Sequence, residues 1–142
     1  MTIAAILMGK GHEVISVSPA DTVMAAATLL AERRIGALPV VADDQVVGIF
    51  SERDVIHALK SGGAEALGRA VGDAMTAPAI TVAPADSVLG ALSLMSRRRI
   101  RHLPVLDQGR LVGFVSIGDL VKYRIDRIEA DAAAMRDYIQ SV

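Results

Sequence analysis

The sequence predicts a mixed α/β fold in which two similar β-α-β-β-α units pack as an intramolecular pseudo-twofold module, followed by a C-terminal helix. The first observation is an internal repeat: residues 14–56 align with residues 79–121 without a gap, and 18 of the 43 aligned positions are identical. The second is that short β-branched runs alternate with helical patterns inside each copy. Two copies favour a paired module, because solenoids usually need three or more repeats.

The first strand and first helix of each unit are predicted from apolar spacing. Glu13–Val17 is a short β-branched run that ends at a proline turn, which favours a strand. We expect Asp21 to cap the helix that follows, and Asp86 to do the same in the second copy. The residues expected on the buried face of these helices are Val23, Ala27 and Leu30, and then Val88, Leu92 and Met95.

The middle of each unit predicts a β-hairpin. Leu38–Val41 and Val46–Phe50 are apolar runs separated by a short turn-forming segment, and residues 107–110 interrupt the second copy in the same way. Ser51 then begins a second helix, which completes the unit.

The repeat divides the chain into four predicted parts. Residues 1–62 hold the first repeat with an N-terminal helical lead-in, and residues 63–72 form a linker rich in Gly and Ala. Residues 73–124 hold the second repeat, and residues 125–142 form the C-terminal helix. A linker this short keeps the two units packed together.

Composition excludes several classes of protein. The chain has 142 residues, 52% of them hydrophobic, which is enough for a packed core. With 15 basic and 16 acidic residues the formal net charge is −1, so no global field attracts nucleic acid or an anionic membrane. The absence of cysteine excludes disulfides, thiolate nucleophiles and cysteine-bound metals. No apolar stretch approaches the ~20 residues that span a bilayer. We therefore expect a soluble cytoplasmic protein.

In both copies a strand ends in the motif Gly-x-x-Ser-x-x-Asp, which places Ser51 and Asp54, and then Ser116 and Asp119, at the start of a helix. A helix N-terminus can hold a phosphate. A carboxylate one turn into the helix can accept two hydrogen bonds from the vicinal hydroxyls of a ribose. The alternative is a helix capping box with Asp in place of the usual Glu. Recurrence of the motif at the same point of a duplicated unit favours a ligand-binding role.

These segments resemble the CBS motif, the cystathionine-β-synthase type of regulatory repeat. The first copy carries the resemblance in Ile35–Val40 and Val47–Val55, and the second in Ile100–Val105 with the Gly-x-x-Ser-x-x-Asp motif that follows. The pair is similar to a Bateman module from Thr2 to Arg124. Together with Ser51-Glu52-Arg53-Asp54, the opening segment resembles the small stand-alone bacterial two-CBS proteins of the signal-transduction type.

The resemblance implies that adenosine-containing ligands bind in clefts between the two repeats. Asp54 and Asp119 would hold ribose hydroxyls, while Ser51 and Ser116 would lie near phosphate. Ser16 and Thr81 would line the adenine slot. The residues that would edge the adenine or the phosphates are Gly36, Ala37, Arg101 and His102.

The two copies differ where charge matters for phosphate. Arg53 in the first copy becomes Gly118 in the second, whereas Gly36-Ala37 becomes Arg101-His102. We therefore expect Arg53 to belong to the nucleotide-binding set, and the two clefts to differ in phosphate affinity.

No feature of the sequence predicts an enzyme or a metal site. The three histidines, His12, His57 and His102, have no metal-ligand spacing, and the serines lack a nucleophile-elbow motif and a base. The cluster Arg97–Arg101 has three interpretations: a solvated surface, phosphate contact by Arg101, or nucleic-acid contact. The last is the least favoured, because no aromatic platform accompanies the arginines.

The C-terminal segment carries a seam of apolar residues whose spacings alternate between four and three, as in a coiled coil. These residues are Val121, Ile125, Ile128, Ala132, Met135, Ile139 and Val142. One interpretation is a helix folded back on its own module, against residues 1–8. The favoured one is a helix that helps two modules pair as a homodimer.

The sequence thus predicts a non-catalytic regulatory sensor that binds AMP, ADP, ATP or NAD(H) and signals occupancy to a regulated partner protein. S-adenosylmethionine is less favoured because of the arginines. Two alternatives stay open: a structural dimerisation module with empty clefts, and nucleic-acid binding through Arg97–Arg101.

Overall fold

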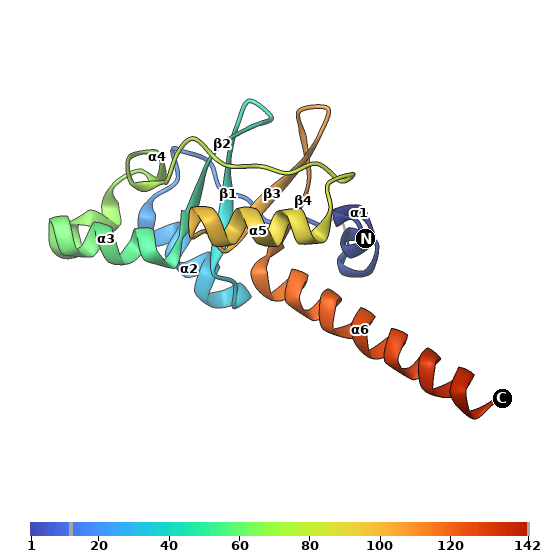
Figure 1. Ribbon diagram of the computed structural model, residues 1–142. Coiled ribbons are helices and arrows are strands. Elements are labelled where there is room, and N and C mark those ends of the chain that lie inside the picture. Colours follow the sequence, from blue (N-terminus) through green and yellow to red (C-terminus); the bar gives the residue numbers. More distant parts are fainter. Residues whose placement is uncertain (12, 142) are drawn as a thin grey trace.

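The computed structural model describes residues 1–11 and 13–141; His12 and Val142, which figure in the predictions above, lie outside the described residues. The chain forms two α/β lobes side by side, and a long helix leaves the second lobe (Figure 1). The first lobe contains α2 (Val23–Arg33), β1 (Ala37–Ala42), β2 (Gln45–Ser51), α3 (Glu52–Gly62), the 3-10 helix η1 (Gly63–Gly68) and α4 (Val71–Ala74). The second contains α1 (Ile3–Lys10), α5 (Val88–Arg98), β3 (His102–Asp107), β4 (Arg110–Ser116) and α6 (Ile117–Gln140). The predicted mixed α/β class is confirmed.

The two hairpins form as predicted. β1 pairs with β2, and β3 with β4, as separate two-stranded antiparallel sheets. Their registers are equivalent, including a shift between Val40 and Val41 and between Val105 and Leu106. The two residues at each turn have positive φ: 51° and 62° at Asp43 and Asp44, and 51° and 79° at Gln108 and Gly109. Positive φ at both central positions gives the turn a twist that matches the flanking strands.

The predicted first strand of each unit is wrong in extent. Only Val17 pairs, in parallel, with Val40: its N–H donates to the Pro39 carbonyl at 3.1 Å, and its carbonyl accepts from Val41 at 2.8 Å. The next ladder bonds on either side would need an N–H from Pro39 and from Pro19, and proline has none. Val82 forms the equivalent single bridge with Val105, and Pro84 and Pro104 lack the N–H groups that would lengthen it. The repeated prolines therefore reduce each strand to one bridge.

The predicted caps are displaced by one residue. Thr22 caps α2, with its side chain accepting the Ala25 N–H at 3.0 Å, and Ser87 caps α5 in the same way. Asp21 instead accepts the Ser18 N–H at 2.8 Å, which closes the proline turn before the helix. Val23, Leu30, Val88 and Met95 are buried as predicted, whereas Ala26 and Ala91 are buried in place of Ala27 and Leu92.

Each lobe has its own core, and the chain crosses between them. Ile3, Ile6 and Leu7 of α1 join the second core, although α1 precedes the first repeat in the chain. Val71 of α4 joins the first core. The two helices take equivalent places in the two lobes. The Ile3 N–H donates to the Asp86 carbonyl and the Val71 N–H donates to the Asp21 carbonyl, and Asp21 and Asp86 are aligned residues of the repeat. The segment predicted as a linker is thus partly helical and supports the first lobe.

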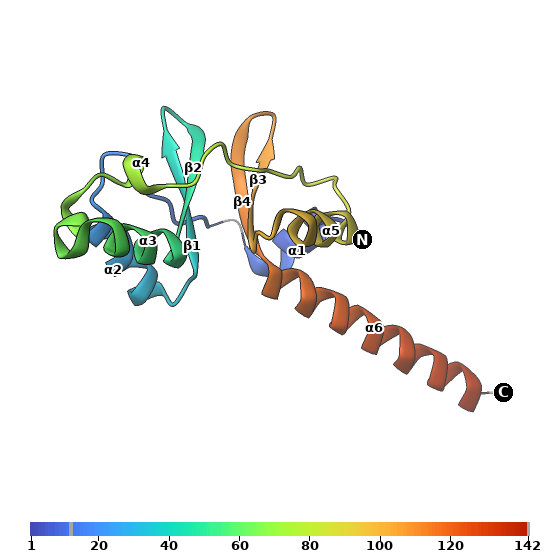
Figure 2. The same cartoon turned by 60° about the vertical axis from the view of Figure 1, so that its left-hand side comes forward.

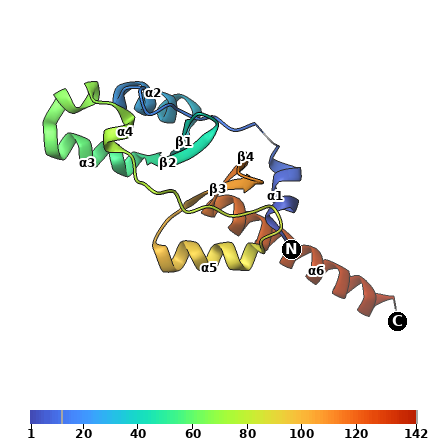
Figure 3. The same ribbon diagram turned by 90° about the horizontal axis from the view of Figure 1, so that it is seen from above.

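The lobes meet along β2 and β4, which contact each other at the centre of the molecule (Figure 2). The segment after α4 runs from the first lobe to the second (Figure 3), and on the way Thr76 forms an antiparallel bridge with Ile49 of β2. This crossing brings Thr76 alongside β2, near the end of the first hairpin.

The C-terminal helix is continuous with the last helix of the second repeat. α6 starts at the Ser116 cap, buries Leu120 completely, and then projects away from the lobes (Figures 1 and 2). The fold-back interpretation is therefore wrong, and Ile128 and Met135 are 52% and 60% exposed. Among the described residues, none of the helices is long and apolar enough to cross a membrane.

Candidate functional site

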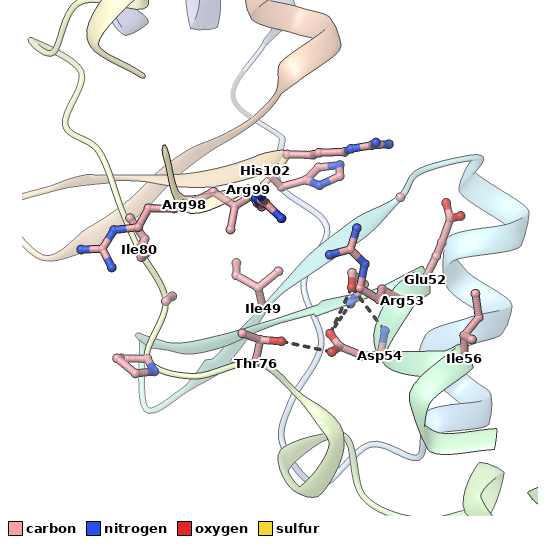
Figure 4. Close-up of a pocket in the computed structure, with 16 residues that line it drawn as sticks. Ile49, Glu52, Arg53, Asp54, Ile56, Thr76, Ile80, Arg98, Arg99 and His102 are labelled. Carbon is pink, nitrogen blue, oxygen red and sulfur yellow. Dashed lines mark hydrogen bonds between the residues drawn. The ribbon is translucent and has the colours of Figure 1, made fainter. Parts of the chain in front are cut away.

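A cavity of about 570 Å³ lies between the two lobes. Its walls come from three places: the end of β2 with the start of α3, the crossing segment after α4, and Arg98–His102 at the entry to β3 (Figure 4). Arg99 and His102 lie across the cavity from Asp54 and Thr76 (Figure 4). The cavity therefore needs both repeats.

The structure brings six of the predicted site residues to this cavity and leaves five outside its walls. The six are Gly36, Ser51, Arg53, Asp54, Arg101 and His102. The five are Ser16, Ala37, Thr81, Ser116 and Asp119. Ser16 and Thr81 are exposed just before the single-residue bridges, and Ala37 is buried at the start of β1. Ser116 and Asp119 lie at the equivalent position of the second repeat.

Asp54 is the one residue with a charged side chain in the buried set of the described residues, with 8% of its surface exposed. The Asp54 N–H donates to the Ser51 hydroxyl oxygen at 3.4 Å and one carboxylate oxygen of Asp54 accepts the Ser51 N–H at 2.9 Å, which completes a capping box with Asp54 at N3. The same carboxylate accepts the Ser51 hydroxyl at 3.2 Å. Its other oxygen accepts the Thr76 hydroxyl at 3.1 Å. All three donors are neutral, and no cation among the residues that the structure describes is bonded to Asp54, whose carboxylate faces the cavity.

Gly48 allows the crossing segment to approach β2. A Cβ at this position would lie 2.7 Å from the Met75 sulfur and 2.8 Å from the Thr76 carbonyl oxygen. The Ile49 and Thr76 backbones exchange two hydrogen bonds of 2.9 Å at this crossing. The glycine of the repeated Val-Gly pair thus positions the hydroxyl that reaches Asp54.

Four arginines line the cavity: Arg53, Arg98, Arg99 and Arg101. None of them lies within ion-pair distance of an acidic side chain among residues 1–11 and 13–141. Arg99 ends α5 in the left-handed conformation, with φ of 54°, which turns the chain into the cavity wall. The cavity holds two carboxylates, Glu52 and Asp54, against these four cations.

His102 lies in the cavity wall between Gly36 of the first repeat and Phe114 of the second. Its ring stacks on Phe114 with centroids 5.7 Å apart, and a Cβ on Gly36 would lie 3.3 Å from its Cε1 atom. Burial, together with the cations Lys10 and Arg101, lowers the pKa of His102 below its ordinary 6.5, although two carboxylates oppose the shift. The ring is therefore neutral at neutral pH.

The second carboxylate has a different environment. Asp119 accepts the Ser116 N–H at 2.8 Å in a capping box equivalent to that of Asp54. It also accepts a hydrogen bond of 2.6 Å from the Lys10 ammonium, at the end of α1. Burial would raise the pKa of Asp119, but hydrogen bonds from Lys10 and Ser116 outweigh burial and hold it below the ordinary 3.8.

Sequence reasoning missed Thr76 and Lys10, the residues that bond to the two carboxylates. The repeat alignment begins at Val14 and Ala79, so it never compares the segments that precede each copy. The detectable signal was a polar residue near the end of each short helix: Lys10 is the last residue of α1, and Thr76 follows α4 by two residues. Among the described residues no group of three His, Cys, Asp or Glu side chains could hold a metal ion.

Comparisons with known proteins agree with this architecture. The sequence profile of the CBS domain matches residues 5–61 and again residues 71–126. The chain is 34% identical to CBS domain-containing protein YhcV of Bacillus subtilis, over 85% of this chain and 86% of that protein. It is 36% identical to the mitochondrial CBS domain-containing protein CBSX3 of Arabidopsis thaliana, over 84% of this chain, and spans 61% of that relative.

Solved structures with the same fold include ligand complexes. The CBS-domain protein ATU1752 of Agrobacterium tumefaciens superposes with a TM-score of 0.84, at 38% identity, covering 87% of this chain and 99% of that one. CBSX2, solved in complex with AMP, has a TM-score of 0.74 at 27% identity and covers 88% and 96%. The CBS domain pair of MJ0100, solved with 5-methylthioadenosine and S-adenosyl-L-methionine, has a TM-score of 0.79 at 26% identity and covers 89% and 98%.

Proposed function

This chain belongs to the CBS-domain family, with two copies of the domain, and we propose that it is a non-catalytic sensor of adenosine-containing nucleotides. The ligand class we propose is AMP, ADP, ATP or NAD(H), bound in the cavity between the repeats. The observation that carries the proposal is the composition of that cavity: one buried carboxylate opposite a group of arginines that have no acidic partner within ion-pair distance in the described part of the chain.

The carboxylate suits a ribose. The three donors to Asp54 are neutral, so a diol hydroxyl that replaces the Thr76 hydroxyl exchanges one neutral donor for another. Hydrogen bonds to a charged acceptor are roughly twice as strong as neutral ones, so the diol gains from this carboxylate. The adenosine part of the proposal is also supported by CBSX2 and MJ0100, whose solved complexes hold adenosine compounds.

The arginines suit phosphate. Arg53 comes from the first repeat and Arg99 and Arg101 from the second, so a phosphate chain extending from a ribose at Asp54 would meet cations from both. The guanidinium group matches phosphate oxygens in a two-point geometry. S-adenosylmethionine carries a sulfonium cation and no phosphate, so these arginines favour nucleotides over it.

A sensor also needs an output. We propose that the module works in the cytoplasm as a homodimer, and that occupancy is passed to a regulated partner protein. The support for pairing is the exposed apolar seam on α6, where Ile125, Ile128, Met135 and Ile139 are each about half exposed or more. An isolated helix segment of this length is marginal in water, so a second copy would stabilise it.

Thermal unfolding with a nucleotide panel tests the proposal. A ligand at ~100 times its dissociation constant adds about 2.7 kcal/mol to the free energy of unfolding, which raises the melting temperature by several degrees at this chain length. Adenine, which lacks ribose and phosphate, is the control and should shift the curve little. Flat curves with AMP, ADP, ATP, NAD and NADH would leave the structural dimerisation module as the better account. Salt-dependent oligonucleotide binding would instead favour the nucleic-acid alternative.

A further inference from the structure

The two repeats hold their equivalent carboxylates with different donors. In the first repeat, the Thr76 N–H donates to the Ile49 carbonyl at 2.9 Å and the Thr76 hydroxyl donates to Asp54 at 3.1 Å. In the second repeat, the Lys10 ammonium donates to the Phe114 carbonyl at 2.6 Å and to Asp119 at 2.6 Å. Phe114 is the residue equivalent to Ile49, 65 positions later. One ammonium therefore bonds both the strand carbonyl and the carboxylate, although it bonds the Asp119 oxygen that also accepts the Ser116 N–H, whereas Thr76 bonds the other oxygen of Asp54.

The length of α1 explains why a lysine reaches this position. α1 begins where α4 begins, relative to its lobe, but it has eight residues whereas α4 has four. The additional turn ends at Lys10, beside β4. Gly113 makes room for this helix, because a Cβ there would lie 2.5 Å from the Leu7 side chain. The Lys10 contact is thus built by the packing of α1 into the second core.

The start of α6 also carries fewer charged residues than the start of α3. The positions equivalent to Glu52 and Arg53 are Ile117 and Gly118, so the start of α6 lacks the charged pair found at the start of α3. Asp119 is partly exposed, with 28% of its side-chain surface accessible, and Lys10 is 40% accessible. The ion pair therefore stands at a surface that a small ligand can reach.

We propose that Lys10 is a specificity-determining residue, which holds Asp119 in an internal ion pair so that a ribose binds the Asp54 cleft in preference to the second cleft. This inference rests on the proposed function, since it assumes that the two carboxylates are the ribose acceptors. A ribose at Asp54 meets a carboxylate that has only neutral donors, whereas a ribose at Asp119 meets a carboxylate whose charge the Lys10 ammonium already offsets. Because Lys10 is partly screened by solvent, the preference amounts to about three- to tenfold in affinity.

Titration calorimetry with adenosine and with AMP tests the role of Lys10. The protein carries Asp54→Asn, which weakens the first cleft and leaves the second cleft to be measured. Adding Lys10→Met should then increase adenosine affinity by about three- to tenfold, because Asp119 is released while the aliphatic length is kept. Lys60→Met is the matched control: Lys60 lies exposed in the last turn of α3, makes no ion pair with a described residue, and should change nothing.

A further substitution, Asp119→Asn in the Lys10→Met protein, should cancel the gain. If Asp54→Asn prevents folding, Lys10→Met alone should change the stoichiometry from one high-affinity nucleotide per chain toward two. An unchanged adenosine affinity overturns the inference. A loss of AMP affinity with adenosine unaffected also overturns it, because Lys10 would then contact the phosphate. Failure of the proposed function is a separate result: the unsubstituted protein would bind none of the nucleotides.

Discussion

Replacing Asp54 by Asn separates ligand binding from helix capping, because both roles fall on the same carboxylate. The side chain closes the capping box at the start of α3 and also faces the cavity between the lobes. Asn keeps the shape and one acceptor oxygen, but it loses the charge and the second acceptor. We therefore expect the ligand-free and ligand-bound measurements to respond very differently.

The cost to the ligand-free protein follows from the three hydrogen bonds of Asp54. The Asn carbonyl can still accept the Ser51 N–H, and the Thr76 hydroxyl can rotate to accept from the Asn amide. The net loss is then close to one ordinary hydrogen bond, about 1 kcal/mol. Since unfolding entropy for a chain of this length is about 0.3 kcal/mol per kelvin, the melting temperature should fall by about 3 °C.

The cost to nucleotide binding is larger. Loss of the charged acceptor under a ribose diol should weaken AMP binding by about ten- to hundredfold in titration calorimetry. Adenine should bind weakly and be little affected. Asp119→Asn is the matched control, because it has the same capping box but is engaged by Lys10, and it should reduce the affinity of the first cleft far less. If Asp54→Asn lowers stability while AMP affinity per folded molecule stays the same, the motif is only a cap and the site assignment is refuted.

Three further perturbations test the rest of the structure. Lys10→Met should lower the free energy of unfolding in urea by less than about 1 kcal/mol at neutral pH. This difference should vanish as the pH falls below 3.8, because a carboxyl with a lowered pKa stabilises the fold only while ionised; a difference that persists in acid would contradict the role of Asp119. Gly48→Ala should cost about 1–3 kcal/mol in equilibrium unfolding, since its Cβ would lie 2.8 Å from a backbone carbonyl. Gly113→Ala should cost less, because a Cβ there faces the flexible Leu7 side chain. Equal costs for the two substitutions would show that the crossing segment moves to make room for the Gly48→Ala methyl group. Glu at both Ile128 and Met135 should give a smaller species in sedimentation that still unfolds cooperatively, and a monomeric unsubstituted protein would refute pairing through α6.

Much of the fold could be read from local pattern. The repeat, the hairpins and the Ser51 and Ser116 helix starts depend on residues near one another in the chain, so a single sequence carries them. The first strands failed for a local reason that was visible but unused: prolines at positions 19 and 39 remove the two N–H groups needed to lengthen the ladder around Val17.

Some residues of the candidate site could be predicted from the sequence, and others only from the structure. The motif places Asp54 and Asp119 at equivalent helix starts, and the family resemblance points to Gly36, Arg101 and His102 as cavity residues. The chain pattern cannot show that Ala37 is buried in its own lobe. Nor can it show that the second carboxylate is already paired, because Lys10 and Asp119 are 109 residues apart.

The sequence by itself determined that the chain is a duplicated α/β module with two carboxylates at matching helix starts, since these features follow from spacing and repetition. Only the tertiary structure decided which segments support which repeat. α1 crosses to the second core and α4 remains with the first, because each buries its apolar residues against the helix and hairpin of that lobe. That packing places a threonine hydroxyl at Asp54 and a lysine ammonium at Asp119, and so makes two nearly identical motifs chemically different.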